Sequence, residues 1–143
     1  MSGVAVIRYL LANNAPLLAI VPATRIVAGG LALIQAMPAI EVRQIDSVLP
    51  FNQVFTNSAP RVFDDRVQVA VVVKGPAATP PGLGYPQLRS LLRLVLAACP
   101  SQRGIVNGIN VESIRPDLEG PDLPPGDVDF YSGSRDFLVR WTA

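Results

Sequence analysis

The stretch from Arg61 to Lys74 constrains the fold more than any other part of this 143-residue chain. Valines at positions 67, 69, 71 and 73 form one apolar face, which is the pattern of a β-strand with a buried side. On the opposite face, Ala70 and Val72 lie between Gln68 and Lys74. We therefore expect a strand in the middle of a sheet, with its centre covered on both faces.

Further strands are predicted on either side of this one. Residues Ala39–Val48 alternate apolar and polar, and the alternation slips near Ile45, which predicts a β-bulge there. The pair Asn107-Gly108 is typical of a two-residue hairpin turn. We also expect strands at Arg25–Val27, Ile105–Val106, Ile109–Ile114 and Val128–Trp141, with the proline-rich stretch Pro116–Gly126 as a loop.

Helical spacing of apolar residues predicts a helix at Gly3–Ala12, a short helical turn at Pro16–Val21 and a longer helix from Tyr85 or Pro86 to Ala98 or Cys99. The longer helix follows a proline- and glycine-rich loop at Gly75–Gly84. This order of elements favours an α+β fold: a mixed, mainly antiparallel sheet with two or three helices packed on one face. We expect residues 1–143 to form a single domain.

Composition excludes several kinds of chemistry. The chain has no histidine and one cysteine, Cys99, which removes the usual ligands of zinc and the base of a serine hydrolase triad. No glycine-rich phosphate loop is present in the sequence. The formal net charge is +1, so no bulk field attracts DNA or an acidic membrane. We therefore predict a protein that is not an enzyme and that holds no metal or cofactor.

Arginine supplies eleven of the twelve basic residues, and Lys74 is the only lysine. Arginine favours bidentate and interface contacts, although a GC-rich genome gives the same bias. The apolar run Val4–Val21 is interrupted by Arg8, two asparagines and Pro16, so it does not predict a signal peptide or a membrane span. We expect a soluble, intracellular chain.

Asp64 and Asp65 are the one adjacent pair of carboxylates. They could bind a divalent ion. The alternative, which we favour, is a turn at the start of the strand in which they pair with Arg61 or Arg66.

Two segments are candidates for partner surfaces. The first is an arm at Leu49–Pro60, bounded by prolines, in which exposed apolar residues would mark an interface unless the arm folds back and buries them. Its candidate contact residues are Phe51, Asn52, Val54 and Phe55. The second is an acidic loop that could face a basic partner, or line a DNA passage without gripping it, or be no more than a solvated loop. Its candidate residues are Asp117, Glu119, Asp122, Asp127 and Asp129.

Short phrases along nearly the whole chain resemble the tail terminator (tail completion) proteins of long-tailed bacteriophages. The phrases are Leu10–Ala12, Val21–Ile26, Met37–Val42, Arg66–Val69, Ala97–Pro100 followed by the Gly104 hairpin, and Asp136–Trp141. One departure from the family is the loop Gly75–Gly84, which is longer than the family's usual link between strand and helix.

The resemblance implies a structural virion protein of the neck region, assembled in the host cytoplasm. Such proteins form a homo-hexameric ring on the tail-tube protein, end tube polymerisation and present a surface to the head-tail connector or stopper protein. DNA passes through the ring without sequence-specific binding, and no membrane is involved. On this view the arm and the acidic loop are the expected partner or lumen surfaces.

Two alternatives remain open from the sequence. The first is another neck protein, such as a head-completion or stopper protein, which would contact the portal or adaptor instead of the tail tube. The second is a small enzyme or ligand-binding α+β domain, which would need a pocket with convergent polar groups.

Overall fold

A computed structural model of the protein describes residues 2–30, 36–48, 61–75, 84–123 and 130–143. The arm at Leu49–Pro60 and most of the predicted loop at Gly75–Gly84 lie outside these residues. The helices are α1 (Ser2–Ala12), α2 (Ala15–Leu18), the 3₁₀ turn η1 (Ala23–Arg25) and α3 (Gly84–Ala98). The strands are β1 (Ile26–Ala28), β2 (Ala39–Val48), β3 (Val62–Lys74), β4 (Gly104–Val106), β5 (Ile109–Glu119) and β6 (Phe130–Thr142).

The strands form one six-stranded sheet in the order β1-β2-β3-β6-β5-β4. Strand β1 runs parallel to β2, and every other neighbouring pair is antiparallel. The two longest strands, β3 and β6, pair along their whole length, from Val62 opposite Thr142 to Lys74 opposite Phe130. The mixed, mainly antiparallel sheet with its helices confirms the predicted α+β class.

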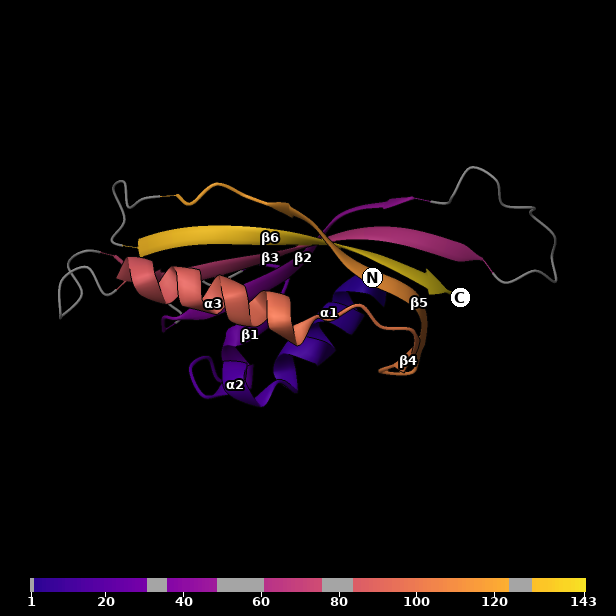
Figure 1. Cartoon of the computed structure of the whole chain (residues 1–143), viewed down its shortest axis with the longest axis horizontal. Coiled ribbons are helices and arrows are strands. Elements are labelled where there is room, and N and C mark those ends of the chain that lie inside the picture. Colours follow the sequence, from indigo (N-terminus) through magenta and orange to yellow (C-terminus); the bar gives the residue numbers. More distant parts are fainter. Residues whose placement is uncertain (1, 31–35, 49–60, 76–83, 124–129) are drawn as a thin grey trace.

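The helices α1 and α3 lie on the same side of the sheet, and the other side carries no helix in the described part of the chain (Figure 1). The alternating valines of β3 face the helices and are fully buried. Ala70 and Val72, on the opposite face, are half-buried. The described helices cover one face of β3, and the expectation that its centre is covered on both faces is met only in part, by the half-burial of these two residues. We call the side of the sheet without a described helix the open face.

Helix α3 packs through the stripe that its spacing predicts: Leu88, Leu91, Leu92 and Val95 are buried. Its first residue, Gly84, sits against strand β3. A Cβ at this position would lie 1.8 Å from the Lys74 carbonyl oxygen, so a residue without a side chain is required where the helix begins. The core between helices and sheet is completed by Val4, Val6, Ile7, Leu11, Leu17, Val21, Ile26, Ile40, Val42, Val111, Ile114, Phe137 and Val139.

Local signals at turns and bulges are confirmed. The pairing of β2 with β3 shifts between Gln44 and Asp46, where the bulge was expected. Asn107 and Gly108 both have positive φ, at 50° and 77°, as a type I′ hairpin turn requires. Asn14, predicted as a stop for α1, also accepts a hydrogen bond from the Leu17 amide and so caps α2.

Two boundaries differ from the prediction. Helix α2 ends at Leu18 and not near Val21. Strand β5 continues through Pro116 to Glu119, where the sequence predicted a loop. Proline is tolerated in an outer strand, and among the described residues this part of β5 pairs with β6 on one side only.

Candidate interaction surfaces

The arm residues predicted as contacts, Phe51, Asn52, Val54 and Phe55, lie outside the described residues, so that hypothesis stays a prediction. The strands that flank the arm are described up to Val48 and from Arg61 onward. The last residues of β2 before the arm are exposed, and Ile45 and Val48 keep 48% and 53% of their surface accessible. The approach to the arm is therefore apolar as well as polar.

Three residues of the predicted acidic loop belong to β5 or follow it directly, and each is paired with arginine. Asp117 contacts Arg66 at 2.9 Å on the open face. Glu119 contacts the guanidinium of Arg89 at 2.8 Å and that of Arg135 at 3.2 Å. Asp127 and Asp129 lie outside the described residues. The described carboxylates of this segment are therefore paired with arginines from β3, α3 and β6 and do not form an unpaired negative surface.

Asp122 ties the end of this segment to helix α3. It contacts Arg89 at 3.3 Å and accepts a hydrogen bond from the Tyr85 hydroxyl at 2.8 Å. The hydrogen bond to Asp122, together with that carboxylate's charge, raises the pKa of Tyr85. The hydrogen bond from Arg89 to Glu119, with the charge of Glu119, raises the pKa of Arg89. The cluster thus holds the end of β5 against the start of α3.

Asp64 and Asp65 lie within strand β3 and not in a turn, and neither pairs with Arg61 or Arg66 as predicted. They point to opposite faces of the sheet, because adjacent residues of a strand alternate. Asp64 receives a bidentate contact from Arg140, from Nε at 2.6 Å and from an Nη at 2.7 Å. No group of acidic, cysteine or histidine residues in the described part of the chain is arranged to hold a metal ion.

Asp65 is a buried carboxylate with 1% of its surface exposed. Its Oδ2 accepts hydrogen bonds from the Gly3 amide at 2.9 Å and from the Trp141 indole nitrogen at 2.8 Å, and its Oδ1 accepts one from the Ser47 hydroxyl. Helix α1, strand β2 and strand β6 are thereby joined at one residue of β3. We call this cluster the Asp65 hub.

The open face carries further polar contacts across the strands. Arg43 of β2 donates from Nε and an Nη to the side-chain oxygen of Gln68 on β3. A cavity of about 440 Å³ opens on this face. Its lining residues are Asp64, Ser113, Arg115, Leu138 and Arg140. Arg140 is already held by Asp64, whereas Arg115 has no hydrogen-bond or ion-pair partner among the described residues.

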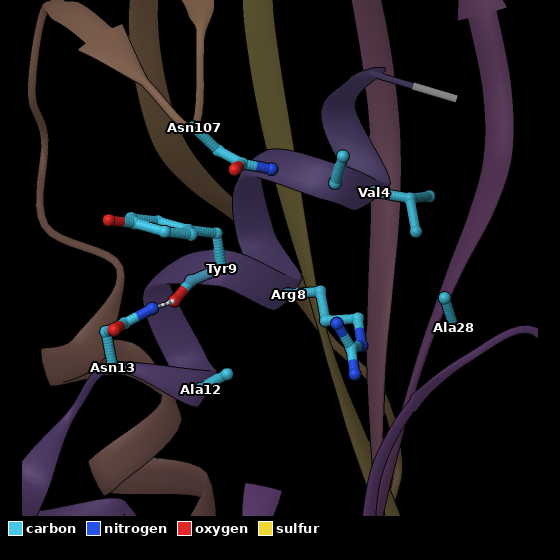
Figure 2. Close-up of a pocket in the computed structure, with 8 residues that line it drawn as sticks. Val4, Arg8, Tyr9, Ala12, Asn13, Ala28 and Asn107 are labelled. Atoms are coloured by element: carbon cyan, nitrogen blue, oxygen red, sulfur yellow. Dashed lines mark hydrogen bonds between the residues drawn. The ribbon is translucent and has the colours of Figure 1, made fainter. Parts of the chain in front are cut away.

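A second pocket, of about 390 Å³, lies over the exposed side of helix α1 (Figure 2). It is lined from α1 and the residue after it by Val4, Ala5, Arg8, Tyr9, Ala12 and Asn13. Ala28, at the end of β1, and Asn107, in the turn between β4 and β5, complete the lining. Figure 2 shows Arg8 and Tyr9 pointing away from one another. Arg8 donates from Nε to the Ile26 carbonyl at 3.1 Å, and the Asn13 side chain bonds the Tyr9 carbonyl at 2.8 Å. The lining is therefore mixed, because aliphatic side chains lie beside two amides, a guanidinium and a phenol.

Sequence reasoning missed the Arg115 cavity and the α1 pocket. Each combines strands or helices that are distant in the chain, so neither has a local signature. The only signal for the first was the excess of arginine over lysine, which predicts bidentate contacts without saying where. Among the described residues, no helix is long and apolar enough to cross a membrane.

The described residues define a small α+β domain in which the helices lie on one side of a six-stranded sheet. No protein-family model matches the chain, and no curated protein sequence matches it. Its fold is similar to that of a chain in a solved structure of the virion of a native gene transfer agent (GTA) particle. The TM-score is 0.67 at 10% sequence identity, over 98% of this chain and 94% of that chain. At this identity the likeness establishes the fold.

Proposed function

We propose that this protein is a structural component of a phage-like virion and not an enzyme. The observation that carries the proposal is the fold similarity, which covers nearly the whole of both chains and involves a chain of a virion particle. The two chains match from end to end, so the similarity is not that of one shared motif inside different proteins. The surfaces described above are compatible with this role, since they offer exposed charged and apolar residues for contact with other chains.

Within the virion, we propose the role of tail terminator: a ring that caps the tail tube, ends its polymerisation and joins it to the head connector. The support for this finer role is the resemblance of the sequence phrases to that family. A domain whose two sheet edges differ also suits a head-to-tail ring, in which each subunit uses one surface toward one neighbour and another toward the next.

The test is to mix the purified protein with tubes of the tail-tube protein from the same genome and to image them by negative-stain electron microscopy. A terminator should sit on one end of each tube and stop its elongation when fresh subunits are added. Deletion of the gene should give particles with overlong tails.

The control for this test is the portal or adaptor protein from the same genome. Binding to the portal or adaptor, with tubes growing unchecked, would assign the chain to another neck protein instead. Binding to neither would contradict a role in the neck.

A further inference from the structure

Strands β2 and β5 flank the central pair β3 and β6, and each has a long outer edge that is unpaired among the described residues. Strand β1 covers β2 only at Ile40–Val42, and β4 covers β5 only at Ile109–Val111. Beyond these short strands, β2 from Arg43 to Val48 and β5 from Glu112 to Glu119 have no strand on their outer side among the described residues. Unpaired edges of this length are usually either blunted or used for contact with another chain.

The register of the strands places the two edges at the same level of the sheet. Asp46 of β2 is opposite Arg66 of β3, Arg66 is opposite Leu138 of β6, and Leu138 is opposite Arg115 of β5. These four residues form one row across the open face, since residues paired in antiparallel strands point to the same side. The row begins with a carboxylate on one edge and ends with a guanidinium on the other.

Neither end of this row has a partner among the described residues. Asp46 and Arg115 are both exposed, and neither makes a hydrogen bond or ion pair with the rest of the described chain. The neighbouring charges on this face are engaged: Arg66 with Asp117, Arg140 with Asp64, and Arg43 with Gln68. Arg115 also lines the 440 Å³ cavity, so a carboxylate that approaches the β5 edge finds both a free guanidinium and room to enter.

We propose that copies of this chain associate edge to edge, with the Asp46 carboxylate of one copy entering the Arg115 cavity of the next. The strands β2, β3, β6 and β5 alternate in direction, so placing β2 of a second copy beside β5 of the first continues the antiparallel alternation. Exposed aliphatic residues accompany the charges on both edges, Ile45 on β2 and Leu118 on β5. The contact is heterologous, so it repeats from copy to copy and closes when the rotations complete a turn.

Pro116 follows Arg115 directly and has no amide hydrogen to donate. It therefore interrupts any continuous hydrogen-bonded ladder on the β5 edge, which protects that edge against strand addition by unrelated chains. Selection of the correct partner is left to the charged pair and to the fit of the cavity. The inference rests on the proposed function in so far as it names the surfaces that join the subunits of the ring.

The experiment measures self-association by sedimentation velocity and native mass spectrometry for the wild type, Asp46→Arg and Arg115→Asp. Each reversal places two like charges in contact, so each should weaken self-association by roughly 10- to 100-fold. The double variant with both reversals should recover it. A mixture of the two single variants should also assemble, with the copies alternating, because every contact in an alternating ring then joins opposite charges.

Arg93→Asp is the matched control, because Arg93 is exposed on helix α3 and has no hydrogen-bond or ion-pair partner in the described structure. It changes the charge of the chain by the same amount as Arg115→Asp and should leave association unchanged. Circular dichroism and melting curves establish that each variant is folded. Wild-type association that both single reversals leave intact, or a wild type that stays monomeric at its highest soluble concentration, would overturn the proposal.

The outcomes separate this inference from the proposed function. A protein that caps tail tubes regardless of these charges keeps its proposed role and loses this interface. A protein that forms charge-dependent rings without binding tubes keeps the interface and loses the terminator role.

Discussion

Replacement of Asp65 by alanine should destabilise the protein strongly, because the Asp65 hub joins three elements through one buried carboxylate. The substitution leaves the donors of Gly3, Ser47 and Trp141 without their acceptor in a site that is 1% exposed. A hydrogen bond to a charged group contributes about 1.5–3 kcal/mol, and contributions within one network do not add fully. We expect a loss of about 3–5 kcal/mol in the free energy of unfolding.

Asp65→Asn provides the graded comparison. Its side-chain oxygen can still accept from Gly3 and Trp141, and its amide can donate to the Ser47 hydroxyl, which is able to accept. We expect the free energy of unfolding to fall by only about 1–2 kcal/mol, because this variant keeps the hydrogen bonds and loses only the negative charge of the carboxylate. Asp64→Asn is the matched control on the neighbouring residue. Its partner Arg140 lies on the exposed face, so its effect should stay within about 1 kcal/mol.

Urea denaturation followed by tryptophan fluorescence measures all three variants. Trp141 is the only tryptophan and donates directly to Asp65, so its emission in the folded state reports on the hub itself. In the alanine variant we expect a shifted folded-state emission together with the lower midpoint. An alanine variant within about 1 kcal/mol of the wild type would refute the view that the hub joins these elements.

Three further predictions test other parts of the structure. Gly84→Ala should lower the free energy of unfolding by about 2–4 kcal/mol, because its Cβ would lie 1.8 Å from a backbone carbonyl oxygen. Gly108→Ala, which has open space around it, should lower it by about 1 kcal/mol. Chemical denaturation of the two variants compares these losses. Burial raises the pKa of the Cys99 thiol to about 12, so a thiol reagent at pH 8 should modify the folded protein only at the rate at which it opens. Modification of the folded protein as fast as in urea would contradict the burial of this thiol. The same pKa shift means that the contribution of the thiol to the free energy of unfolding is complete below pH 9 and is lost as the pH rises toward 12. Asp122→Asn should lower the pKa of Tyr85 toward its ordinary value, as measured by NMR titration of labelled tyrosine with Tyr85→Phe for assignment; an unchanged titration would show that Asp122 does not hold the hydroxyl.

The elements of the fold could be predicted largely because their signals are local. The stripe of α3, the bulge beside Ile45 and the Asn107-Gly108 turn depend on neighbours a few residues away. The order of strands could not be predicted, because periodicity shows which face of a strand is buried but not which strand lies next to it. Strand β6 lies between β3 and β5 although it is the last in the chain.

The same limit explains what was missed at the candidate surfaces. The partners of Asp65 lie 62, 18 and 76 residues away, so the adjacent carboxylates looked like a turn or an ion site in the sequence. The end of β5 was predicted as a loop because the segment Pro116–Gly126 is rich in proline. Only its pairing with β6 shows that Pro116 belongs to an outer strand. The row from Asp46 to Arg115 exists only once three registers are known.

The excess of arginine over lysine gains a physical interpretation from these contacts. Arg140 donates hydrogen bonds from two nitrogens to Asp64, and Arg43 donates from two nitrogens to Gln68. The single ammonium nitrogen of a lysine cannot reproduce this geometry. A sheet face fixed by such pairs presents little mobile charge of its own. The residues at its two edges that have no partner in the described part of the chain then decide which surface can bind there. This is why opposite charges at Asp46 and Arg115 can select a second copy of the chain on a surface whose net charge is close to neutral.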